Sequence, residues 1–573
     1  MYQNNNFRKS QISISQAKAS QAQAKRRRQI AKIILSVVVL IGIVTFLFSG
    51  IKSLSQAMPD FFNANFKDKK ESSKENHKRN FEEIEEDSFA SFNIASSAQT
   101  SNSPPPSLIQ NSSARNAIWS ISIRNSQGAE IYAYNSGLRL TPASNLKLLT
   151  SAAVIDSLGA DYQFETQIYG MGELKDTGVW DGDIYILGAG DPSISGAFFG
   201  GEKFAVFKEF TKQLKERGIQ SITGRVIGND SLFENTDRIP QTWHWEDLSY
   251  YYASEISALS FNDNCIDLEV KAQGRIGEKP QISWFPFNTD YIDLVNEQII
   301  TSRKEAYEEH YQRELGINRI ILRSHLPQGY KEGESLTISN PALFFVDSFT
   351  KFAIQDGIKI TKKPRLNHEF QDFKGTGFNL LASHKSPMLK DLLKRVNKHS
   401  DNFYTETLLR AAAAEKYGKN NKISAREKDG IQLIKTYACA HGFDCNQLVI
   451  HDGAGLSSEN FISTTEMTQL LLKSKDQSEN GLGNNFAAFK DSLSIAGIDG
   501  TLQGRFGKSP LIGKIKGKSG YVEGVIALSG YLENKAGEEL TFSLITNHFP
   551  NSQKNEIRSI QNKILERAYE GNL

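Results

Sequence analysis

The feature that most constrains the fold is that both ends of the folded sequence indicate strands beside a helix. At residues 117–137, AIWSISIRNSQGAEIYAYNSG alternates apolar residues with serine, and a turn at Asn125–Gly128 leads to a second β-rich run, which is typical of a hairpin. A helix follows, with Pro142 near its first turn and Gly159 just past its end. Near the C-terminus, GVIALSGYLENKAGEELTFSLITN predicts strands, and an amphipathic helix follows at about 552–569. We therefore expect one α/β domain closed by both ends of the chain.

A different sequence texture separates these two ends. From about residue 163 to residue 371, short β-like runs are broken by glycine, asparagine and aspartate, as in GDIYILGAGDPSIS and DNCIDLEVKAQG. This spacing predicts one or two β-rich modules inserted into the α/β domain. We place the first part of the α/β domain at 116–165, the inserted β-rich domains at 166–375, and the second part of the α/β domain at 376–573.

The N-terminal region predicts a membrane anchor. In KRRRQIAKIILSVVVLIGIVTFLFSGI a basic cluster precedes an uncharged apolar run that would span about 28 Å as a helix, close to the thickness of a bilayer core. Because the basic flank comes first, we expect a cytoplasmic basic tail at 1–29, a transmembrane anchor at 30–51 and an exported remainder. A cleaved signal peptide is the alternative, with Ser55–Ala57 as a small-residue cleavage site, and the protein would then be secreted.

Residues 52–115 are predicted to form a disordered linker. KDKKESSKENHKRNFEEIEEDS is densely charged, and SSAQTSNSPPPSLIQNSS is rich in serine, asparagine and proline, so neither segment can build a core. The whole chain of 573 residues carries a net charge of only +2, which argues against a nucleic-acid-binding protein.

The three cysteines do not have the spacing of a zinc site, and no histidine-rich cluster compensates, so we expect neither a metal nor a cofactor. Cys439 and Cys445, in CAHGFDC, either form a short disulfide in an oxidising compartment or remain two thiols near a helix end.

A possible nucleophile and base lie at the start of the first predicted helix. Ser144 and Lys147, in SNLK, are three positions apart and share a helix face, so the lysine can stand beside the hydroxyl. A serine needs such a base to attack a carbonyl, and the unpaired N–H groups of the first helical turn favour a developing anion. The lysine acts as a base only when neutral, so its pKa must be lowered. An isolated SxxK match is most often a serine and a lysine on the surface of an ordinary helix.

Two further motifs follow in order along the chain. Ser400-Asp401-Asn402 lies where a loop meets a helix, and alone would be explained as a helix N-cap. Lys518-Ser519-Gly520 precedes a β-run near the C-terminus, and alone would be explained as a basic turn. Because SxxK, SxN and K[ST]G follow one another in this order, the three matches are unlikely to be coincidental.

These motifs resemble the signature of serine β-lactamases and penicillin-binding proteins. The long insertion between the first two motifs, together with GDIYILGAGDPSIS, SEISALSFNDN, LASHKSPMLKDLLKRVNKHSDN and HDGAGLSSENFIS, is similar to the low-molecular-mass class C penicillin-binding proteins, peptidase family S13. The resemblance covers about residue 117 to the C-terminus. It implies an α/β fold, a serine β-lactamase/penicillin-binding-protein-like transpeptidase domain, with the inserted β-rich domains and preceded by one transmembrane helix.

The resemblance also implies roles for individual residues. Ser144 would be acylated with Lys147 as its general base, and Ser400 and Lys518 would relay a proton to the leaving D-alanine. Asn402 would bind the substrate backbone. The remaining implied contacts are those of Lys518 and Ser519 with the terminal carboxylate, and an oxyanion hole formed by the backbone N–H groups of Ser144 and of Tyr521, which follows Gly520.

Two positions raise questions about substrate binding. Tyr521 stands where a small residue is more usual, so its ring is expected to narrow the cleft, whereas Ser519 in place of threonine keeps its hydroxyl. Asp230, in GNDSLFE, is a candidate ligand for the cationic end of a stem peptide, although a turn-forming aspartate is the alternative.

The sequence thus predicts a serine-type D-Ala-D-Ala carboxypeptidase/endopeptidase that acts on peptidoglycan stem peptides and is inhibited by β-lactams. It would be anchored in the bacterial inner membrane with its catalytic domain in the periplasm. A β-lactamase-type hydrolase is the second hypothesis, disfavoured because a class A glutamate context is not evident and the insertion fits the peptidase better. A catalytically inactive, anchored cell-wall binding protein is the third, disfavoured because all three motifs keep their chemical groups.

Overall fold

The computed structural model describes residues 106–375, 377–418, 422–476 and 482–573. Both ends of this part of the chain meet in one six-stranded antiparallel sheet, in the order β2-β1-β23-β22-β21-β20. Ile118 of the first strand pairs with Asn547 of the last, which confirms that the domain is closed by its two ends. The strands are β1 (Ile118–Arg124), β2 (Glu130–Tyr134), β20 (Ser494–Ile495), β21 (Ile515–Val522), β22 (Val525–Glu533) and β23 (Glu539–Asn547).

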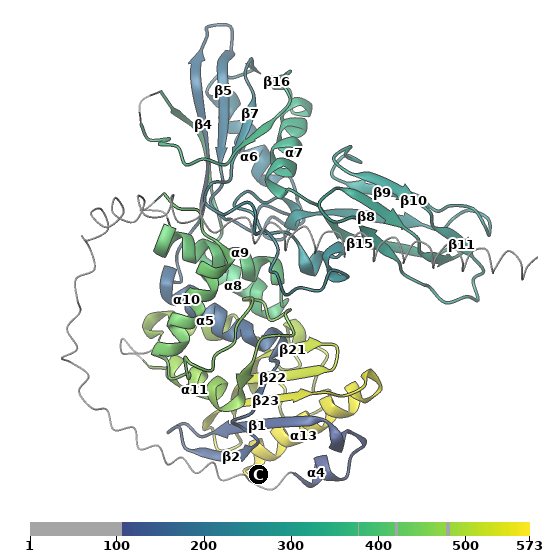
Figure 1. The fold of residues 1–573 in the computed structure, drawn as a ribbon, viewed down its shortest axis with the longest axis vertical. Coiled ribbons are helices and arrows are strands. Elements are labelled where there is room, and N and C mark those ends of the chain that lie inside the picture. Colours follow the sequence, from purple (N-terminus) through teal and green to yellow (C-terminus); the bar gives the residue numbers. More distant parts are fainter. Residues whose placement is uncertain (1–105, 376, 419–421, 477–481) are drawn as a thin grey trace, which may run out of the picture. The chain divides into compact units, whose positions relative to one another are not determined.

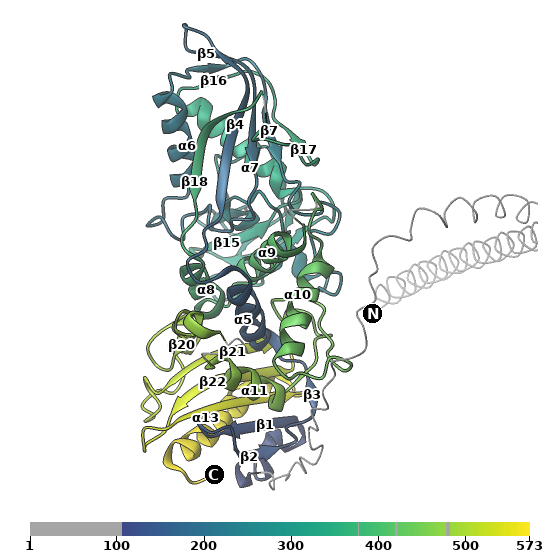
Figure 2. The same cartoon turned by 90° about the vertical axis from the view of Figure 1, so that its left-hand side faces the viewer.

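Both faces of this sheet are covered, as Figures 1 and 2 show. Along β22, Ile526, Leu528 and Leu532 belong to the core shared with the C-terminal helix α13 (Lys554–Glu570). Tyr531, with the opposite parity, packs into the core of the helical layer on the other face. Because strand side chains alternate between faces, a strand covered on both sides carries the nearly continuous apolar run seen here.

The helical layer places the first motif inside the protein. Every residue of helix α5 from Leu146 to Ile155 is buried, since it is surrounded by neighbouring helices and by the sheet. It ends at Gly159, whose φ of +84° suits glycine. The helices of this layer are α5 (Leu146–Leu158), α8 (Leu389–Lys398), α9 (Asn402–Ala413), α10 (Glu427–Ala440), α11 (Thr464–Ser474) and α12 (Phe486–Asp491).

The inserted region contains more helix than its sequence texture predicts. Its seven-stranded mixed sheet packs with helices α6 (Ala205–Glu216) and α7 (Pro341–Gln355). The strands of that sheet are β4 (Glu165–Leu174), β5 (Val179–Leu187), β6 (Ser221–Ile222), β7 (Val226–Asn229), β16 (Lys359–Ile360), β17 (Arg365–Asn367) and β18 (Asn379–Lys385).

Smaller sheets make up the rest of the insertion. One has the order β15-β8-β9, another β10-β13-β12, and β11 pairs with β14. Their bounds are β8 (Cys265–Lys271), β9 (Gln281–Phe285), β10 (Asp293–Asn296), β11 (Ile299–Thr301), β12 (Tyr311–Arg313), β13 (Arg319–Leu322), β14 (His325–Pro327) and β15 (Lys331–Thr337).

The predicted boundary at 375/376 does not coincide with the end of this module. Strand β18 lies beyond that boundary, yet it pairs antiparallel with β4 over Asn379–Lys385. A strand belongs to the sheet whose backbone groups it pairs with, so the module extends to Lys385. The long-range pairing of two strands separated by about two hundred residues leaves no local signal in the sequence.

The end of the predicted linker is ordered. Helix α4 (Ser107–Gln110) and a 3₁₀ turn at Ser113–Asn116 lie within 52–115 or across its end, and Ile109 and Ala114 are buried in the core beneath α13. The predicted tail, anchor and most of the linker lie outside the described residues. Within the residues described, no helix combines the length and apolar character needed to cross a bilayer.

Candidate active site

Ser144 lies on a tight turn against which two backbone segments pack. The turn is a 3₁₀ helix at Ala143–Asn145 that leads directly into α5, and Ala143 has an unusual φ of +47°. A Cβ on Gly520 of β21 would come within 2.8 Å of the Pro142 carbonyl oxygen, and one on Gly455 within 2.0 Å of the Ala143 carbonyl oxygen. Only glycine permits these approaches, so the turn is held from both sides.

Lys147 is buried and directed at Ser144 by two other acceptors. Its Nζ lies 3.1 Å from Ser144 Oγ, 2.6 Å from Asn402 Oδ1 and 2.5 Å from the Ala454 carbonyl oxygen. A neutral amine has two N–H groups and one lone pair. The two fixed acceptors can take both N–H groups, which directs the lone pair at the Ser144 hydroxyl.

The environment of Lys147 favours its neutral form. Burial lowers the pKa of Lys147 from its ordinary 10.5 to about 8, against the smaller opposing effect of Asp452, of Asp401 and, when it is ionised, of Glu406. A base with a pKa near the working pH combines availability with proton affinity. The predicted nucleophile and base are therefore brought together, and the base has a suitable pKa.

The second motif contributes a hydroxyl and an amide to the same place. Asp401 is the N-cap of α9 and accepts from the Tyr404 N–H at 3.1 Å, while Ser400 just before it has a φ of +61°. The amide of Asn402 accepts from Lys147 and donates to the Tyr252 carbonyl oxygen at 2.8 Å. Asn402 thus holds Lys147 in addition to any contact with substrate.

The third motif places a second buried lysine beside Ser400. Lys518 Nζ donates to Ser400 Oγ at 2.8 Å and to the Ser519 carbonyl oxygen at 2.7 Å. Burial, and to a lesser extent the charge of Lys147, lowers the pKa of Lys518 well below its ordinary value. An incoming carboxylate would stabilise the charged form of this amine.

Strand parity sends the Tyr521 ring away from the nucleophile. Lys518 and Gly520 are of one parity on β21, and Gly520 faces the Ser144 turn. Tyr521 has the opposite parity, and its ring lies under Lys554 Nζ, 3.5 Å from the ring centroid, near α13. The ring is thus directed toward α13, while Tyr521 still lines the cleft that Ser144 lines, so the narrowing of that cleft by Tyr521 stays a prediction.

A cleft of about 920 Å³ joins these groups. Ser144, Ser400, Asn402 and Tyr521 all line it. Further lining residues come from the inserted region, from α8 and the loop after it, from the loop at 455–458 and from the end of β21, namely His244, Glu246, Asp247, Tyr251, Tyr252, Arg395, His399, Asp401, Gly455, Leu456, Ser458, Val522 and Glu523.

Asp230 does not belong to this cleft. It is buried, and His368 Nδ1 lies 2.6 Å from its Oδ1. The Asp230 carboxyl is covered, while its partner His368 has a side chain that is 42% exposed, and burial raises the pKa of Asp230. The acidic side chains that do line the cleft are those of Glu246, Asp247, Asp401 and Glu523.

Two buried carboxyl groups were not singled out from the sequence. Glu406 Oε1 accepts from the N–H groups of Gly453 and Ala454 at 2.7 and 2.6 Å, which fixes the segment whose carbonyl holds Lys147. Asp452 accepts from three successive backbone N–H groups at 455–457 and from Trp243 Nε1. The Asp-Gly-x-Gly run at 452–455 is the signal that could have indicated a tight, carboxylate-held loop.

Comparison with known proteins now identifies the family. The model of the D-Ala-D-Ala carboxypeptidase 3 (S13) family matches residues 107–568. The chain belongs to this family. It is similar to D-alanyl-D-alanine carboxypeptidase DacB of Haemophilus influenzae, with 28% identity over 73% of this chain and 82% of the relative. It is also similar to the D-alanyl-D-alanine carboxypeptidase of Actinomadura sp. strain R39, with 27% identity over 73% of this chain and 76% of the relative.

The fold agrees with this membership. The crystal structure of penicillin binding protein 4 (dacB) from Haemophilus influenzae superposes with a TM-score of 0.67 and 26% identity, covering 79% of this chain and 97% of that one. The α/β architecture and the inserted region are therefore those of an S13 peptidase.

Proposed function

We propose that this S13 family member is a serine-type D-Ala-D-Ala carboxypeptidase that cleaves peptidoglycan stem peptides through an acyl-enzyme at Ser144 and is acylated by penicillins. The observation that carries the proposal is the position of Lys147, whose amine is held by Asn402 and Ala454 at 3.1 Å from Ser144 Oγ. Family membership and the names of the relatives support the substrate class.

Acylation follows from this geometry. Neutral Lys147 takes the hydroxyl proton as Ser144 Oγ bonds to the carbonyl carbon of the penultimate D-alanine. The oxyanion is stabilised by the backbone N–H groups of Ser144 and Tyr521, where the loss of one donor typically costs about 10²–10³ in kcat. The C–N bond then breaks, and a proton reaches the leaving amine through Ser400 and Lys518, which lie 2.8 Å apart.

Substrate recognition uses the middle of strand β21. Lys518 meets the terminal carboxylate, whereas the Ser519 side chain has the parity of Tyr521 and its hydroxyl donates to Thr501 Oγ1 at 2.8 Å. Water hydrolyses the acyl-enzyme and restores Ser144. The same steps cleave a cross-link when the leaving amine belongs to a second stem peptide, so the proposal covers endopeptidase activity. Digestion of purified cross-linked and uncross-linked muropeptides measures the preference.

We place the enzyme on the periplasmic side of the bacterial inner membrane, tethered by the apolar segment at 33–51. Fractionation of cells expressing the full chain tests this placement. Recovery with the membrane fraction is expected, and recovery as a shortened, soluble periplasmic protein would show that the segment is cleaved.

Labelling with a fluorescent penicillin tests the acyl-enzyme. The full chain should be labelled covalently, and Ser144→Ala should not. Ser157→Ala, on the same helix but away from the motifs, should label like the unaltered protein. The proposal fails if the unaltered protein does not label, as the inactive cell-wall-binding hypothesis requires. Rapid release of the label as hydrolysed drug would instead favour the β-lactamase hypothesis.

A further inference from the structure

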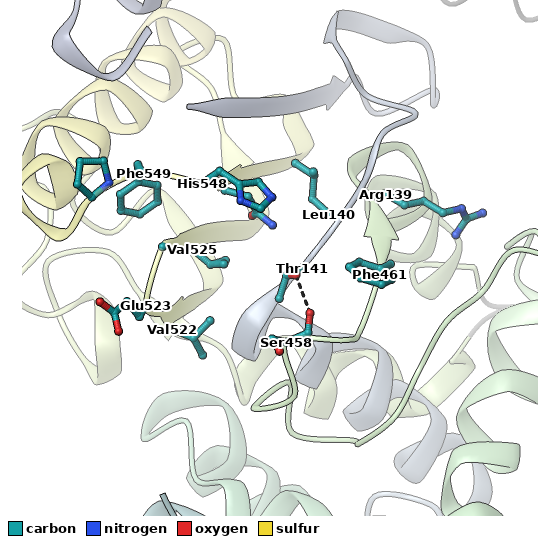
Figure 3. Close-up of a pocket in the computed structure, with 13 residues that line it drawn as sticks. Arg139, Leu140, Thr141, Ser458, Phe461, Val522, Glu523, Val525, His548 and Phe549 are labelled. Carbon is teal, nitrogen blue, oxygen red and sulfur yellow. Dashed lines mark hydrogen bonds between the residues drawn. The ribbon is translucent and has the colours of Figure 1, made fainter. Parts of the chain in front are cut away.

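A second hollow of about 730 Å³ lies beside Val522, where strand β21 ends. Figure 3 shows Val522 on one side of it and Phe461 on the other. Arg139 is the arginine in its lining, and both carboxylate oxygens of Glu466 hold it, at 3.1 and 2.8 Å. This cation is therefore already neutralised. Pro550, which also lines the hollow, leads into helix α13, where the cations are in a different situation.

Three cations lie in a row beside the first turns of α13. Lys554 and Arg558 are four positions apart on the helix and so share a face, and Asn562 continues that face one turn further. Arg505 reaches the same face from the segment before β21, because its Nε donates to Asn562 Oδ1 at 2.8 Å. We call Lys554, Arg558 and Arg505 the α13 cation row.

The α13 cation row lacks acidic partners. Among the residues that the structure describes, no carboxylate forms an ion pair with a member of the row. Glu556, the acid of the first turn of α13, accepts instead from the Ser113 N–H at 3.1 Å, and Glu566 accepts from the Ser509 hydroxyl at 2.6 Å. Other lysines of the same domain do have carboxylate partners at 2.6 to 2.7 Å, namely Lys514, Lys516 and Lys535.

Neutral groups surround the row without cancelling its charge. The centroid of the Tyr521 ring lies 3.5 Å from Lys554 Nζ and 5.9 Å from Arg558 Cζ, and Arg505 Nη2 donates to Gln561 Oε1 at 2.9 Å. Burial, followed by the charge of Arg558, lowers the pKa of Arg505 to about 9, so the guanidinium still carries its charge at neutral pH. Like charges held side by side destabilise one another, so an anion bound to the row would relieve this repulsion.

A phosphate group matches the row better than a carboxylate does. A guanidinium group pairs with two oxygens of either anion at once. Three cations, together with the partial positive charge at the N-terminal end of a helix of 17 residues, exceed what one carboxylate can neutralise. A phosphate monoester carries a charge of about −1.5 to −2 near neutral pH and has three acceptor oxygens.

We propose that the α13 cation row is a binding site for a phosphate group, either as the free ion or as a monoester. The inference goes beyond the proposed peptidase activity and does not rest on it. Lys554 contacts the ring of Tyr521, which also lines the catalytic cleft, so the site adjoins that cleft on the side of β21 that faces α13.

Calorimetric titration of the unaltered full chain provides the first test. Inorganic phosphate, glycerol 3-phosphate and acetate are compared at about pH 7.5 and at one ionic strength, because salt screens such contacts. We expect saturable binding of phosphate at one site and binding of acetate that is weaker by at least about tenfold. The tighter of the two phosphate compounds would show whether the ligand is the free ion or a monoester. Acetate binding as tightly as phosphate, or no binding of either phosphate compound, would overturn the proposal and leave the acyl-enzyme unaffected.

Arg558→Gln tests the position of the site. Its affinity for phosphate should fall by at least about tenfold, and its Tm without phosphate should be unchanged or higher, because the repulsion with Arg505 is removed. Lys563→Gln, an exposed lysine on α13 that faces away from the row, is the matched control and should change neither. Undiminished phosphate binding in Arg558→Gln, or an equal loss in Lys563→Gln, would contradict the proposed site. A lower Tm of Arg558→Gln without phosphate would also contradict it, since Arg558 would then already have stabilising partners.

Discussion

At the scale of single residues, the ability of the Lys147 amine to act as a base depends on its hydrogen-bond partners. Lys147 has Asn402 Oδ1 and the Ala454 carbonyl oxygen as acceptors, and Ser144 Oγ completes its surroundings. Asn402 and Ala454 are in turn held by the Tyr252 carbonyl oxygen and by Glu406. The lysine is therefore a directed base, because its neighbours leave one direction for its lone pair.

The pH dependence of acylation should follow Lys147. Since its neutral form predominates only above its pKa of about 8, the second-order rate constant with benzylpenicillin should rise about tenfold per pH unit below that pKa and level off above it. Stopped-flow or gel measurements on the full chain from pH 6 to pH 9.5 test this, with drug hydrolysis in Ser144→Ala subtracted. A rate constant that is flat across this range would exclude Lys147 as the base.

We expect Glu406 to matter because it holds the backbone of Gly453 and Ala454 in place, and not because of its charge. Burial raises the pKa of Glu406 to about 8, so the carboxyl is mostly protonated at neutral pH and Glu406→Gln retains an acceptor of the same shape. Glu406→Ala leaves the N–H groups of Gly453 and Ala454 unpaired, which costs roughly 1–3 kcal/mol for each buried group. We expect the glutamine variant to keep most of its acylation rate and its Tm, and the alanine variant to lose both. If glutamine is as damaging as alanine, the charge of Glu406 matters and its hydrogen-bonded shape does not explain its role.

At the scale of elements, the active site is a contact between a strand and a turn. Gly520 of β21 faces Pro142, Ala143 and Asn145, and the alternation of strand side chains puts Lys518 on the same parity as Gly520 and Tyr521 on the other. The close approach of β21 to the turn at Ala143–Asn145 brings the third motif to the first.

Gly520→Ala should separate these elements. Its Cβ would lie 2.8 Å from the Pro142 carbonyl oxygen and 3.1 Å from the Asn145 nitrogen, both backbone atoms that cannot rotate away. Acylation by a penicillin should fall at least tenfold, and the overpacking should lower stability by roughly 1–3 kcal/mol. Gly333→Ala is the matched control, because a strand Cβ there meets only the Leu268 carbonyl oxygen at 3.8 Å. Acylation retained in Gly520→Ala would show that this approach is dispensable.

At the scale of the whole molecule, the inserted region takes part in building the site. The Tyr252 carbonyl oxygen accepts from Asn402, and Asp263 contacts Arg395 at 3.5 Å. Arg395 Nε in turn donates to Asp401 at 3.0 Å. The insertion therefore positions the Ser400–Asn402 loop in addition to lining the cleft.

Asp263→Asn should reveal this coupling in a pH-dependent way. Burial, followed by the charge of Asp401, raises the pKa of Asp263 to about 7, so its attraction to Arg395 is present above that pH and lost below it. We expect acylation of Asp263→Asn to be reduced several-fold at pH 8 and to match the unaltered protein near pH 5.5. Asp293→Asn, an exposed acid of the same region, serves as the control. A defect of equal size at both pH values would attribute the loss to side-chain shape alone.

Local patterns were sufficient for much of the fold and for the groups that the structure brings together around Ser144. The hairpin, the helical segment between Pro142 and Gly159, and the final strands and helix follow from periodicity and from proline and glycine. Helices α6 and α7 and the pairing of β18 with β4 were missed, because a β-rich texture masks isolated helices and distant pairing leaves no local pattern.

Cys439 and Cys445 form a disulfide in the structure. The sequence had left open whether they form a disulfide or remain two thiols. Asp230 was a candidate for binding a ligand, and in the structure it is buried beside His368. Burial depends on what packs over a residue, and that information is spread over the whole chain.

The sequence by itself determined which groups we propose for the chemistry, because SxxK, SxN and K[ST]G indicate a nucleophile, its base and a relay in order, whatever their positions in space. Only the tertiary structure decided how those groups work. Burial of Lys147 lowers its pKa, and Glu406 and the loop at 453–455 hold one of its acceptors in place. The folded chain also directs the Tyr521 ring toward α13 and forms a second hollow beside Val522. Desolvation, strand parity and close backbone approach arise from contacts between distant segments, so they exist only once the chain has folded.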